Sequence, residues 1–424
     1  MRASSCLRRA AGGERARIVR YGRFLANDKV TLEALLAGWG EQTRSAVAGR
    51  HVLAIQDTSE VSFRTRPQRR RGLGEVGKGN AHGVLLHAML AVDAGSDSCL
   101  GLVSGEIWTR RGRAAVDHRR RPLADKESQR WLTTPERAKQ VLEPAAMVTV
   151  IDDREGDIYA KWATVAGHDF HLLTRVMQDR VLPDGRRLYE AAAGFALADV
   201  ATIDLMARPG RPARQAKVAL RFGPVALQRP ERAPRDLPKS LALNLVELVE
   251  LDPPGDGEPL HWRLLTTHAL ADAAAAWQIV KWYRKRWIIE QLFRILKSQG
   301  LQLEDSRLET AERLLKLTAI AAKAAAITLQ LVQARDGASP EPASIAFSGE
   351  QIELLAAIAT RYDGRTRLQS NPHPPKSLAW AAWIIARLGG WDGYPRTKPG
   401  PITMHHGLQY FLGISQAWPA IRHV

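Results

Sequence analysis

The sequence predicts a mixed α/β fold in which apolar strands alternate with helices. Two short apolar runs, HVLAI at 51–55 and AAMVTVI at 145–151, have the composition of strands buried on both faces. The stretch 124–142 between them has the apolar spacing of a helix, and the Ala- and Leu-rich stretch 308–335 is strongly helical. This alternation is typical of a domain in which helices pack on a sheet.

With 424 residues, the chain is long enough for two or three domains with cores of their own. An antiparallel β insertion is expected because 214–227 and 241–250 alternate or run apolar between Pro- and Gly-rich turns. The expected segments are a basic N-terminal helical segment (1–48), the first part of the core (49–176), the β insertion (177–270), the second part of the core (271–335) and a C-terminal helical region available for dimerisation (336–424).

Composition limits the function classes. The chain has 61 Lys and Arg against 44 Asp and Glu, a formal charge of +17. This surplus predicts a polyanionic partner, nucleic acid first; a basic protein with no such partner is the alternative. Cys6 and Cys99 are too few for a disulfide scaffold and lack zinc-site spacing. Because no apolar run resembles a membrane span or secretory signal, we expect a cytoplasmic protein with no membrane partner.

The first acidic candidate, Asp57, follows the apolar run 51–55. An Asp at the end of a buried strand projects into a cleft rather than into the core. The alternative is that Asp57 begins a turn with Thr58 and Ser59, which is a common use of Asp.

A second acidic cluster follows the run 145–151, with four carboxylates in the six positions from Asp152 to Asp157. Such a cluster is tolerated at the surface, or where a divalent cation or an arginine compensates the repulsion. Two strand-borne aspartates and Glu290, from a later helix, would together hold two Mg²⁺ ions if they met at one point, since hard cations prefer oxygen ligands.

The stretch 281–300, KWYRKRWIIEQLFRILKSQG, predicts one helix with a polar and an apolar face. Tyr283, Arg286, Glu290 and Lys297 are three, four and seven positions apart, so they share one face. A solvated face with ion pairs is the alternative interpretation. Trp262, ahead of this helix, is either a packed ring or a ring that stacks on an unpaired base.

Together these motifs resemble the DDE transposases of bacterial insertion sequences, of the insertion-sequence-four type with a Tyr-x2-Arg-x3-Glu-x6-Lys signature. The residues named above match that signature at every spacing. IQDTSEVSF resembles the first acidic motif and VIDDREGDIY the "DRE-x-D-I" motif, which selects Asp153 rather than Asp152. KES-x-x-W at 126–131 and ARLGGW at 386–391 add to a resemblance that runs from about 20 to 415.

The resemblance implies a ribonuclease-H-like core interrupted by a β insertion, and divalent-metal catalysis of DNA cleavage and strand transfer through a hairpin. It implies two Mg²⁺ ions (Mn²⁺ as a substitute), and a homodimer that synapses two transposon ends before insertion into target DNA. The implied metal ligands are Asp57, Asp153 and Glu290. The implied DNA contacts are Tyr283, Arg286, Lys297 and Arg175 on phosphates and Trp262 on a flipped base.

One departure from the family concerns the N-terminus. Members usually carry a further N-terminal helical segment that recognises the element's ends, and only its tail is expected here, from about Tyr21 and Phe24. A second hypothesis is therefore an N-terminally truncated, non-catalytic DNA-binding protein or inhibitor derived from a transposase. A general nuclease of the ribonuclease-H fold is a third.

Overall fold

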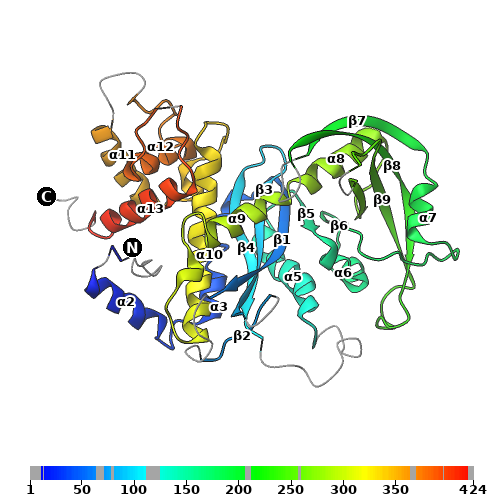
Figure 1. Ribbon diagram of the computed structural model, residues 1–424, viewed down its shortest axis with the longest axis horizontal. Coiled ribbons are helices and arrows are strands. Elements are labelled where there is room, and N and C mark those ends of the chain that lie inside the picture. Colours follow the sequence, from blue (N-terminus) through cyan, green and yellow to red (C-terminus); the bar gives the residue numbers. More distant parts are fainter. Residues whose placement is uncertain are drawn as a thin grey trace.

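The computed structural model describes residues 11–12, 14–63, 71–77, 81–110, 125–205, 212–255, 259–362, 369–394 and 396–418. Figure 1 shows an elongated molecule with the C-terminal helices at one end, strands β7 to β9 at the other and the core strands between them.

The strands are β1 (His51–Ser62), β2 (Gly74–Glu75), β3 (His82–Asp93), β4 (Cys99–Trp108), β5 (Met147–Asp152), β6 (Phe170–Arg175), β7 (Leu197–Leu205), β8 (Arg214–Gln228), β9 (Ser240–Glu250) and β10 (His261–Thr266). The α-helices are α2 (Arg15–Leu25), α3 (Leu32–Ala37), α4 (Glu41–Ala46), α5 (Arg130–Leu142), α6 (Tyr159–Thr164), α7 (Leu188–Ala193), α8 (Ala273–Arg284), α9 (Trp287–Lys297), α10 (Ala311–Ala334), α11 (Gly349–Tyr362), α12 (Leu378–Leu388) and α13 (Pro401–Ser415).

One sheet contains all ten described strands. Its order is β2-β3-β1-β5-β6-β10-β9-β8-β7, with β4 also paired to β3. β1 is antiparallel to β3 and parallel to β5, and β5 is parallel to β6. From β6 onward, each neighbouring pair is antiparallel. The strands of the expected β insertion continue the core sheet, because β10 pairs with β6 on one side and β9 on the other.

The side chains of β1 alternate between two packed layers, as the two-residue period of a strand requires. Leu53 and Ile55 belong to a core shared with α9 and α10, whereas Val52 and Ala54 belong to a core shared with α5 and α6. All four side chains are fully buried, which confirms that this run is a strand covered on both faces. The alternation also assigns Asp57 to the α9 face.

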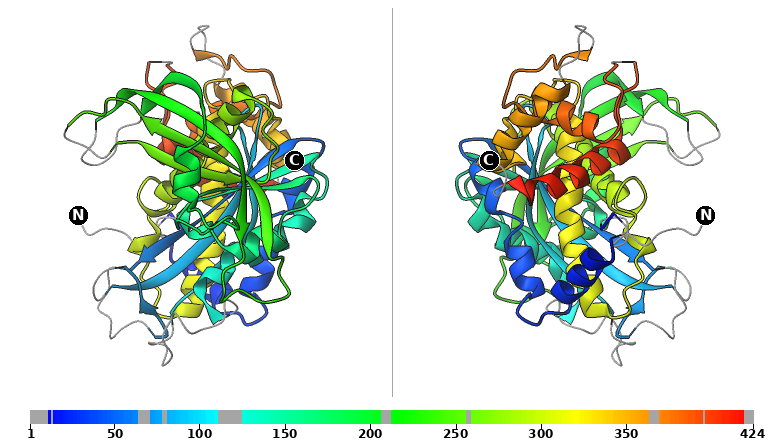
Figure 2. Two further views of the ribbon diagram at one scale, coloured as in Figure 1. Left: turned by 90° about the vertical axis from the view of Figure 1, so that its right-hand side faces the viewer. Right: turned by 90° about the vertical axis from the view of Figure 1, so that its left-hand side faces the viewer.

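α10 is a 24-residue helix in the middle of the molecule. Against the expectation from sequence, it is long and apolar enough to cross a membrane, but 67% of its apolar window is buried inside the protein. It packs against β4, α9, α12 and α13, and Figure 2 shows α13 lying across it. Its position is that of a core helix.

The ARLGGW motif lies where α12 and α13 cross closely. A Cβ atom on Gly389 would overlap the carbonyl oxygen of Thr403, and a Cβ on Gly407 would overlap that of Ile385. The backbones approach so closely that only glycine is accommodated at both positions. Gly390 also has a positive φ of 90°.

Two helices expected to be continuous are divided. The helix expected at 31–46 becomes α3 and α4, separated by a turn at Gly38–Gly40. The helix expected at 281–300 is divided between α8 and α9. Backbone bonds there span three residues instead of four, among them Lys285 N to Trp282 O and Ile288 N to Lys285 O. A three-residue turn is tighter than an α-turn, so α9 is rotated relative to α8.

Candidate active site

Asp57 and Asp153 are brought together by the register of β1 and β5. The parallel ladder of these strands ends at the pair Ile55 and Ile151, and two steps further the same register matches Asp57 with Asp153. The sequence placed Asp57 at the end of its strand, but β1 continues beyond it to Ser62 along β3. Only its pairing with β5 ends there, so Asp57 lies where the two parallel strands separate.

The acidic cluster after β5 is divided by its ion pairs. Asp152 is fully buried and pairs with the buried Lys161. Arg130 pairs with Glu155 at 2.6 Å. Arg180 pairs with Asp157 at 2.8 Å.

Asp153 is the remaining member of the cluster, and it has no ion pair among the described residues. Its carboxylate accepts a 2.8 Å hydrogen bond from the backbone N–H of Glu155 and lies close enough to Asp57 to raise the pKa of that group. The geometry thus separates Asp153 from the structural acid Asp152 beside it.

Arg286 connects Asp57 to the helix acid Glu290. Its Nη1 donates to Asp57 Oδ2 at 2.7 Å, and its Nη2 donates to Glu290 Oε1 at 2.8 Å. The turn between α8 and α9 positions Arg286, a residue that is only 9% exposed and whose guanidinium lies 5.0 Å from the centre of the Trp287 ring. Residues 229 positions apart in the chain therefore share one cation.

Burial raises the pKa of Asp57 to about 6. The positive charge of Arg286 opposes this shift, while the negative charges of Asp153 and Glu290 add to it. Three carboxylates from β1, the end of β5 and α9 therefore influence one another around a single arginine, and the site favours additional positive charge.

Carboxylate oxygens are the ligands that Mg²⁺ prefers, so the donor types suit a hard cation. Their arrangement does not suit such an ion, because in the described part of the chain no three His, Cys, Asp or Glu side chains are grouped to hold one ion. Between Asp57 and Glu290 the cation is the guanidinium of Arg286. The acids are thus paired with an internal cation rather than gathered as a metal cage.

The expected DNA contacts lie around the same site. Tyr283 is buried and meets the ring of Trp262 edge-to-face at 5.3 Å. Arg175 donates to the backbone oxygen of His261 at 3.2 Å, and its charge influences Tyr283. Lys297 lies two turns along α9 from Glu290, where the nearby charges are those of Glu304 and Glu60; burial lowers the pKa of Lys297.

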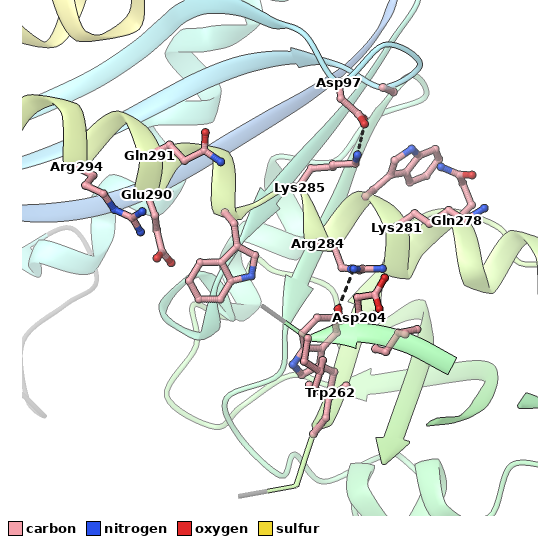
Figure 3. A pocket seen from close by; sticks show the side chains of 16 residues that line it. Asp97, Asp204, Trp262, Gln278, Lys281, Arg284, Lys285, Glu290, Gln291 and Arg294 are labelled. Carbon is pink, nitrogen blue, oxygen red and sulfur yellow. Dashed lines mark hydrogen bonds and ion pairs between the residues drawn. The ribbon is translucent and has the colours of Figure 1, made fainter. Parts of the chain in front are cut away.

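A cavity of about 910 Å³ opens beside Glu290. Trp262, Trp282 and Trp287 line it, as do the cations of α8 and α9: Lys281, Arg284, Lys285 and Arg294. Figure 3 shows Glu290, Gln291 and Arg294 on one side, the Lys285–Asp97 ion pair, and Arg284 donating to the backbone oxygen of Asp204 at 3.1 Å. Aromatic faces beside cations are what stacked bases and phosphates require.

Some of these residues carry no signal in the sequence that would identify them. The excess of acids after β5 indicates that cations must lie nearby. No sequence pattern identifies those cations, which are Arg130, Lys161 and Arg180. Trp287 and Arg284 lie inside the 281–300 motif, next to Arg286 and Tyr283. The tight turn within that motif determines which of its side chains reach the cavity.

A structural comparison finds a weak likeness to the piggyBac transposase in its synaptic complex with hairpin DNA, with a TM-score of 0.35 and 11% sequence identity, covering 68% of this chain and 48% of that one. The chain thus spans about half the length of that protein, and a likeness of this size transfers no property. The match to a family is stronger: residues 108–327, just over half of the chain, match the transposase DDE domain. The matched range includes Asp153 and Glu290 but begins after Asp57. The chain belongs to the transposase DDE domain family.

Proposed function

We propose that the protein is a cut-and-paste DNA transposase, which cleaves transposon ends through a hairpin intermediate and joins them to target DNA. The observation that carries this proposal is the meeting of Asp57, Asp153 and Glu290 around Arg286. These acids come from three distant parts of the chain, and a solvated helix face would not bring them together.

Asp57, Asp153 and Glu290 would hold the divalent ions, two Mg²⁺ or Mn²⁺, after Arg286 has left them. Ions held by these acids would supply the positive charge that in-line displacement at a phosphodiester requires. Burial is the main cause of the raised pKa of Asp57, and the charges of Asp153 and Glu290 add to it; that both acids act on Asp57 supports a shared role for the three.

The chain's own cations would hold the DNA. Arg286 exchanges its two carboxylate partners for a phosphate of the transposon end, since a guanidinium binds phosphate as readily as carboxylate. Tyr283, Arg175 and Lys297 are proposed as further phosphate contacts. Trp262 is proposed to stack on the base displaced when the hairpin forms, and the aromatic cavity beside it supports this assignment.

The proposed core is ribonuclease-H-like. The antiparallel strands β4, β3 and β1, followed by the parallel strands β5 and β6, support this assignment. A dimer that synapses two DNA ends is also proposed. It would use exposed apolar side chains of α13: Ile402, Tyr410 and Leu412.

The test is a cleavage assay on DNA carrying the terminal sequence of the protein's own element, with Mg²⁺ or Mn²⁺. Wild-type protein should nick this DNA and yield hairpin ends, and Asp153→Asn, which removes one acid without changing side-chain size, should not. DNA binding without cleavage by the wild type would instead indicate a non-catalytic DNA-binding protein. Equal cleavage of unrelated DNA would indicate a general nuclease.

A further inference from the structure

A chain of hydrogen-bonded polar side chains crosses the sheet on the face opposite Asp57. Arg130 Nε donates to Thr58 Oγ1 at 2.8 Å, and Thr58 Oγ1 bonds His87 Nδ1 at 2.8 Å. His87 Nε2 bonds Gln56 Oε1 at 3.0 Å, and Gln56 Nε2 donates to Asp152 Oδ1 at 2.7 Å. We call these five residues the buried polar chain; Gln56, His87 and Asp152 have no exposed surface.

Donor and acceptor chemistry fixes the direction of every bond in the chain. Gln56 Nε2 also donates to the backbone oxygen of Trp131 at 3.3 Å, so its Oε1 is the acceptor that faces His87. His87 then carries a proton on Nε2, and in the neutral ring Nδ1 accepts from the Thr58 hydroxyl. That hydroxyl in turn accepts from Arg130, which is only a donor. All donors therefore point from Arg130 towards Asp152.

This direction requires a neutral His87, because a protonated ring could not accept from Thr58. Burial, together with the charges of Arg130 and Lys161, holds the pKa of His87 well below its ordinary value. Both ends of the chain are compensated: Arg130 pairs with Glu155, and Asp152 pairs with Lys161. A fully satisfied buried network of this kind stiffens its surroundings.

The buried polar chain begins where the backbone ladder ends. β1 and β5 are joined by backbone bonds only up to Ile55 and Ile151, and the Gln56–Asp152 bond is the next link between them. Thr174 on β6 donates to Asp152 at 2.8 Å, and His87 lies opposite Thr58 on β3. Side chains thus join β1 to β5 at the level where their backbone ladder has ended, while the main chain still pairs β1 with β3 and β5 with β6.

The members of the chain are also the sequence neighbours of the acids. Gln56 and Thr58 flank Asp57, and Asp152 precedes Asp153. Since alternate side chains of a strand point to opposite faces, fixing Gln56 and Thr58 on one face fixes the backbone from which Asp57 projects on the other.

We propose that the buried polar chain is a positioning device that sets the separation of Asp57 and Asp153, acting through the backbone from the far side of the sheet. The proposal rests on the proposed function for its catalytic meaning, but the constraint on the strands stands without it. It also gives a role to part of the KES-x-x-W motif: the backbone oxygen of Glu127 accepts from Arg130 at 2.6 Å, and the Trp131 ring meets His87 edge-to-face at 4.8 Å.

The experiment uses Thr58→Val, which keeps the shape of the side chain but removes its hydroxyl, and Thr58→Ser, which restores the hydroxyl. Gln56→Met breaks the chain at its centre. Leu354→Ala, on the buried face of α11 far from these strands, is the control for a loss of stability in general. The thermal midpoints of Leu354→Ala, Thr58→Val and Gln56→Met are measured first, so that variants of equal stability can be compared.

The first measurement is amide hydrogen exchange in peptides covering 52–60 and 147–156, without metal or DNA. We expect exchange there to be about tenfold faster in Thr58→Val and Gln56→Met, because local opening no longer has to break the side-chain links. Thr58→Ser should match the wild type. Unchanged exchange in both broken variants, or an equal change in Leu354→Ala, would overturn the proposal.

The second measurement is the Mn²⁺ concentration that gives half-maximal cleavage of end DNA. It should rise about tenfold in Thr58→Val, the lower end of what losing an indirect partner of a metal ligand usually costs, and return to normal in Thr58→Ser. If Thr58→Val and Leu354→Ala needed the same Mn²⁺ concentration for half-maximal cleavage, the result would contradict a positioning role for the buried polar chain. A wild-type protein that never cleaves DNA would refute the proposed function instead, and the exchange measurement would still decide the role of the chain.

Discussion

The guanidinium of Arg286 donates a 2.7 Å hydrogen bond to the carboxylate of Asp57 while its other nitrogen holds Glu290. Two of the three acids proposed as metal ligands thus share one positive charge that the protein itself supplies. We expect a divalent ion at these two acids to compete with this arginine, and a phosphate group offers the arginine an alternative partner. Metal binding and DNA binding are therefore expected to support each other.

Arg286→Gln should expose this competition. The variant leaves two partly buried carboxylates without their cation, so we expect it to be less stable than wild type by about 1–3 kcal/mol in the absence of metal. Mn²⁺ should then stabilise it, by about 2.7 kcal/mol at a hundredfold excess over Kd, while DNA-free wild type responds weakly. Thermal unfolding with and without Mn²⁺ measures both effects.

The control for this substitution is Arg294→Gln, which removes an exposed arginine from the same helix. Its response to Mn²⁺ should match that of wild type. An equal Mn²⁺ response in wild type and Arg286→Gln would show that the arginine does not compete with the ion.

Asp57→Asn should abolish cleavage and yet stabilise the protein at neutral pH. The pKa of Asp57 is about 6 in the fold against an ordinary 3.8, so the folded state holds the proton more tightly than the unfolded state. The group's contribution to stability is favourable at low pH and is lost as the pH rises through 4 to 6. Above pH 6 the charge costs up to about 3 kcal/mol, which asparagine avoids.

Urea unfolding of wild type and Asp57→Asn at pH 7.5 and pH 4 checks this prediction. The variant should be the more stable protein at pH 7.5, and the difference should shrink at pH 4. A less stable Asp57→Asn at pH 7.5 would mean that its ion pair with Arg286 outweighs the cost of burial.

Acid should destabilise the protein through three clustered histidines. His268 stacks on His171 with ring centres 3.9 Å apart, and both His268 and His51 bond Thr149 Oγ1 at 2.8 Å. Burial lowers the pKa of each ring, that of His268 to about 3. Their contribution is therefore complete above the unfolded value of about 6.5 and is lost as the pH falls below it.

For His268 alone this loss is on the order of 2 kcal/mol at pH 5. His268→Phe keeps a ring for stacking but cannot be protonated, so its unfolding midpoint should fall less than that of wild type between pH 7 and pH 5. His168→Asn, at a largely exposed position outside the cluster, should behave like wild type. Equal slopes for wild type and His268→Phe would show that the cluster does not control acid stability.

Gly407→Ala should separate α12 from α13. The added methyl group would overlap the carbonyl oxygen of Ile385, and overpacking of this kind costs about 1–3 kcal/mol. Gly413→Ala on the same helix meets only Arg17 Nη1, at 4.0 Å, so it should be neutral or gain up to about 1 kcal/mol of helix propensity. Circular dichroism melts of the two variants compare them directly; an equally stable Gly407→Ala would show that the crossing can relax.

Local patterns in the sequence predicted much of this molecule. Apolar runs located β1 and β5, and the spacing in 281–300 correctly separated the buried Leu292 and Leu296 from Glu290. What the sequence could not provide was pairing between distant segments. The register that matches Asp57 with Asp153, the contact of Arg286 with Asp57 and the link between Gln56 and His87 all depend on how strands align. No single-chain periodicity encodes that alignment.

The place of the β insertion in the sheet is another pairing between distant segments. Its strands have the alternation of any antiparallel sheet, and nothing in that pattern reveals which edge they join. The divided helix is a similar case: KWYRKRW has no glycine or proline to mark a break, and the tight turn is visible only in the backbone bonds.

β10 lies between the strand that ends at Arg175 and the strands that reach the far end of the molecule. Deletion of residues 177–250 would remove β9, the partner of β10. The N–H and C=O groups of β10, the strand that carries Trp262, would then be unpaired along one edge. Such an edge recruits other chains, so the shortened protein should precipitate rather than work. The distal strands are thus a continuation of the sheet that carries the proposed active site, and any DNA lying on them would be held in fixed alignment with its acids.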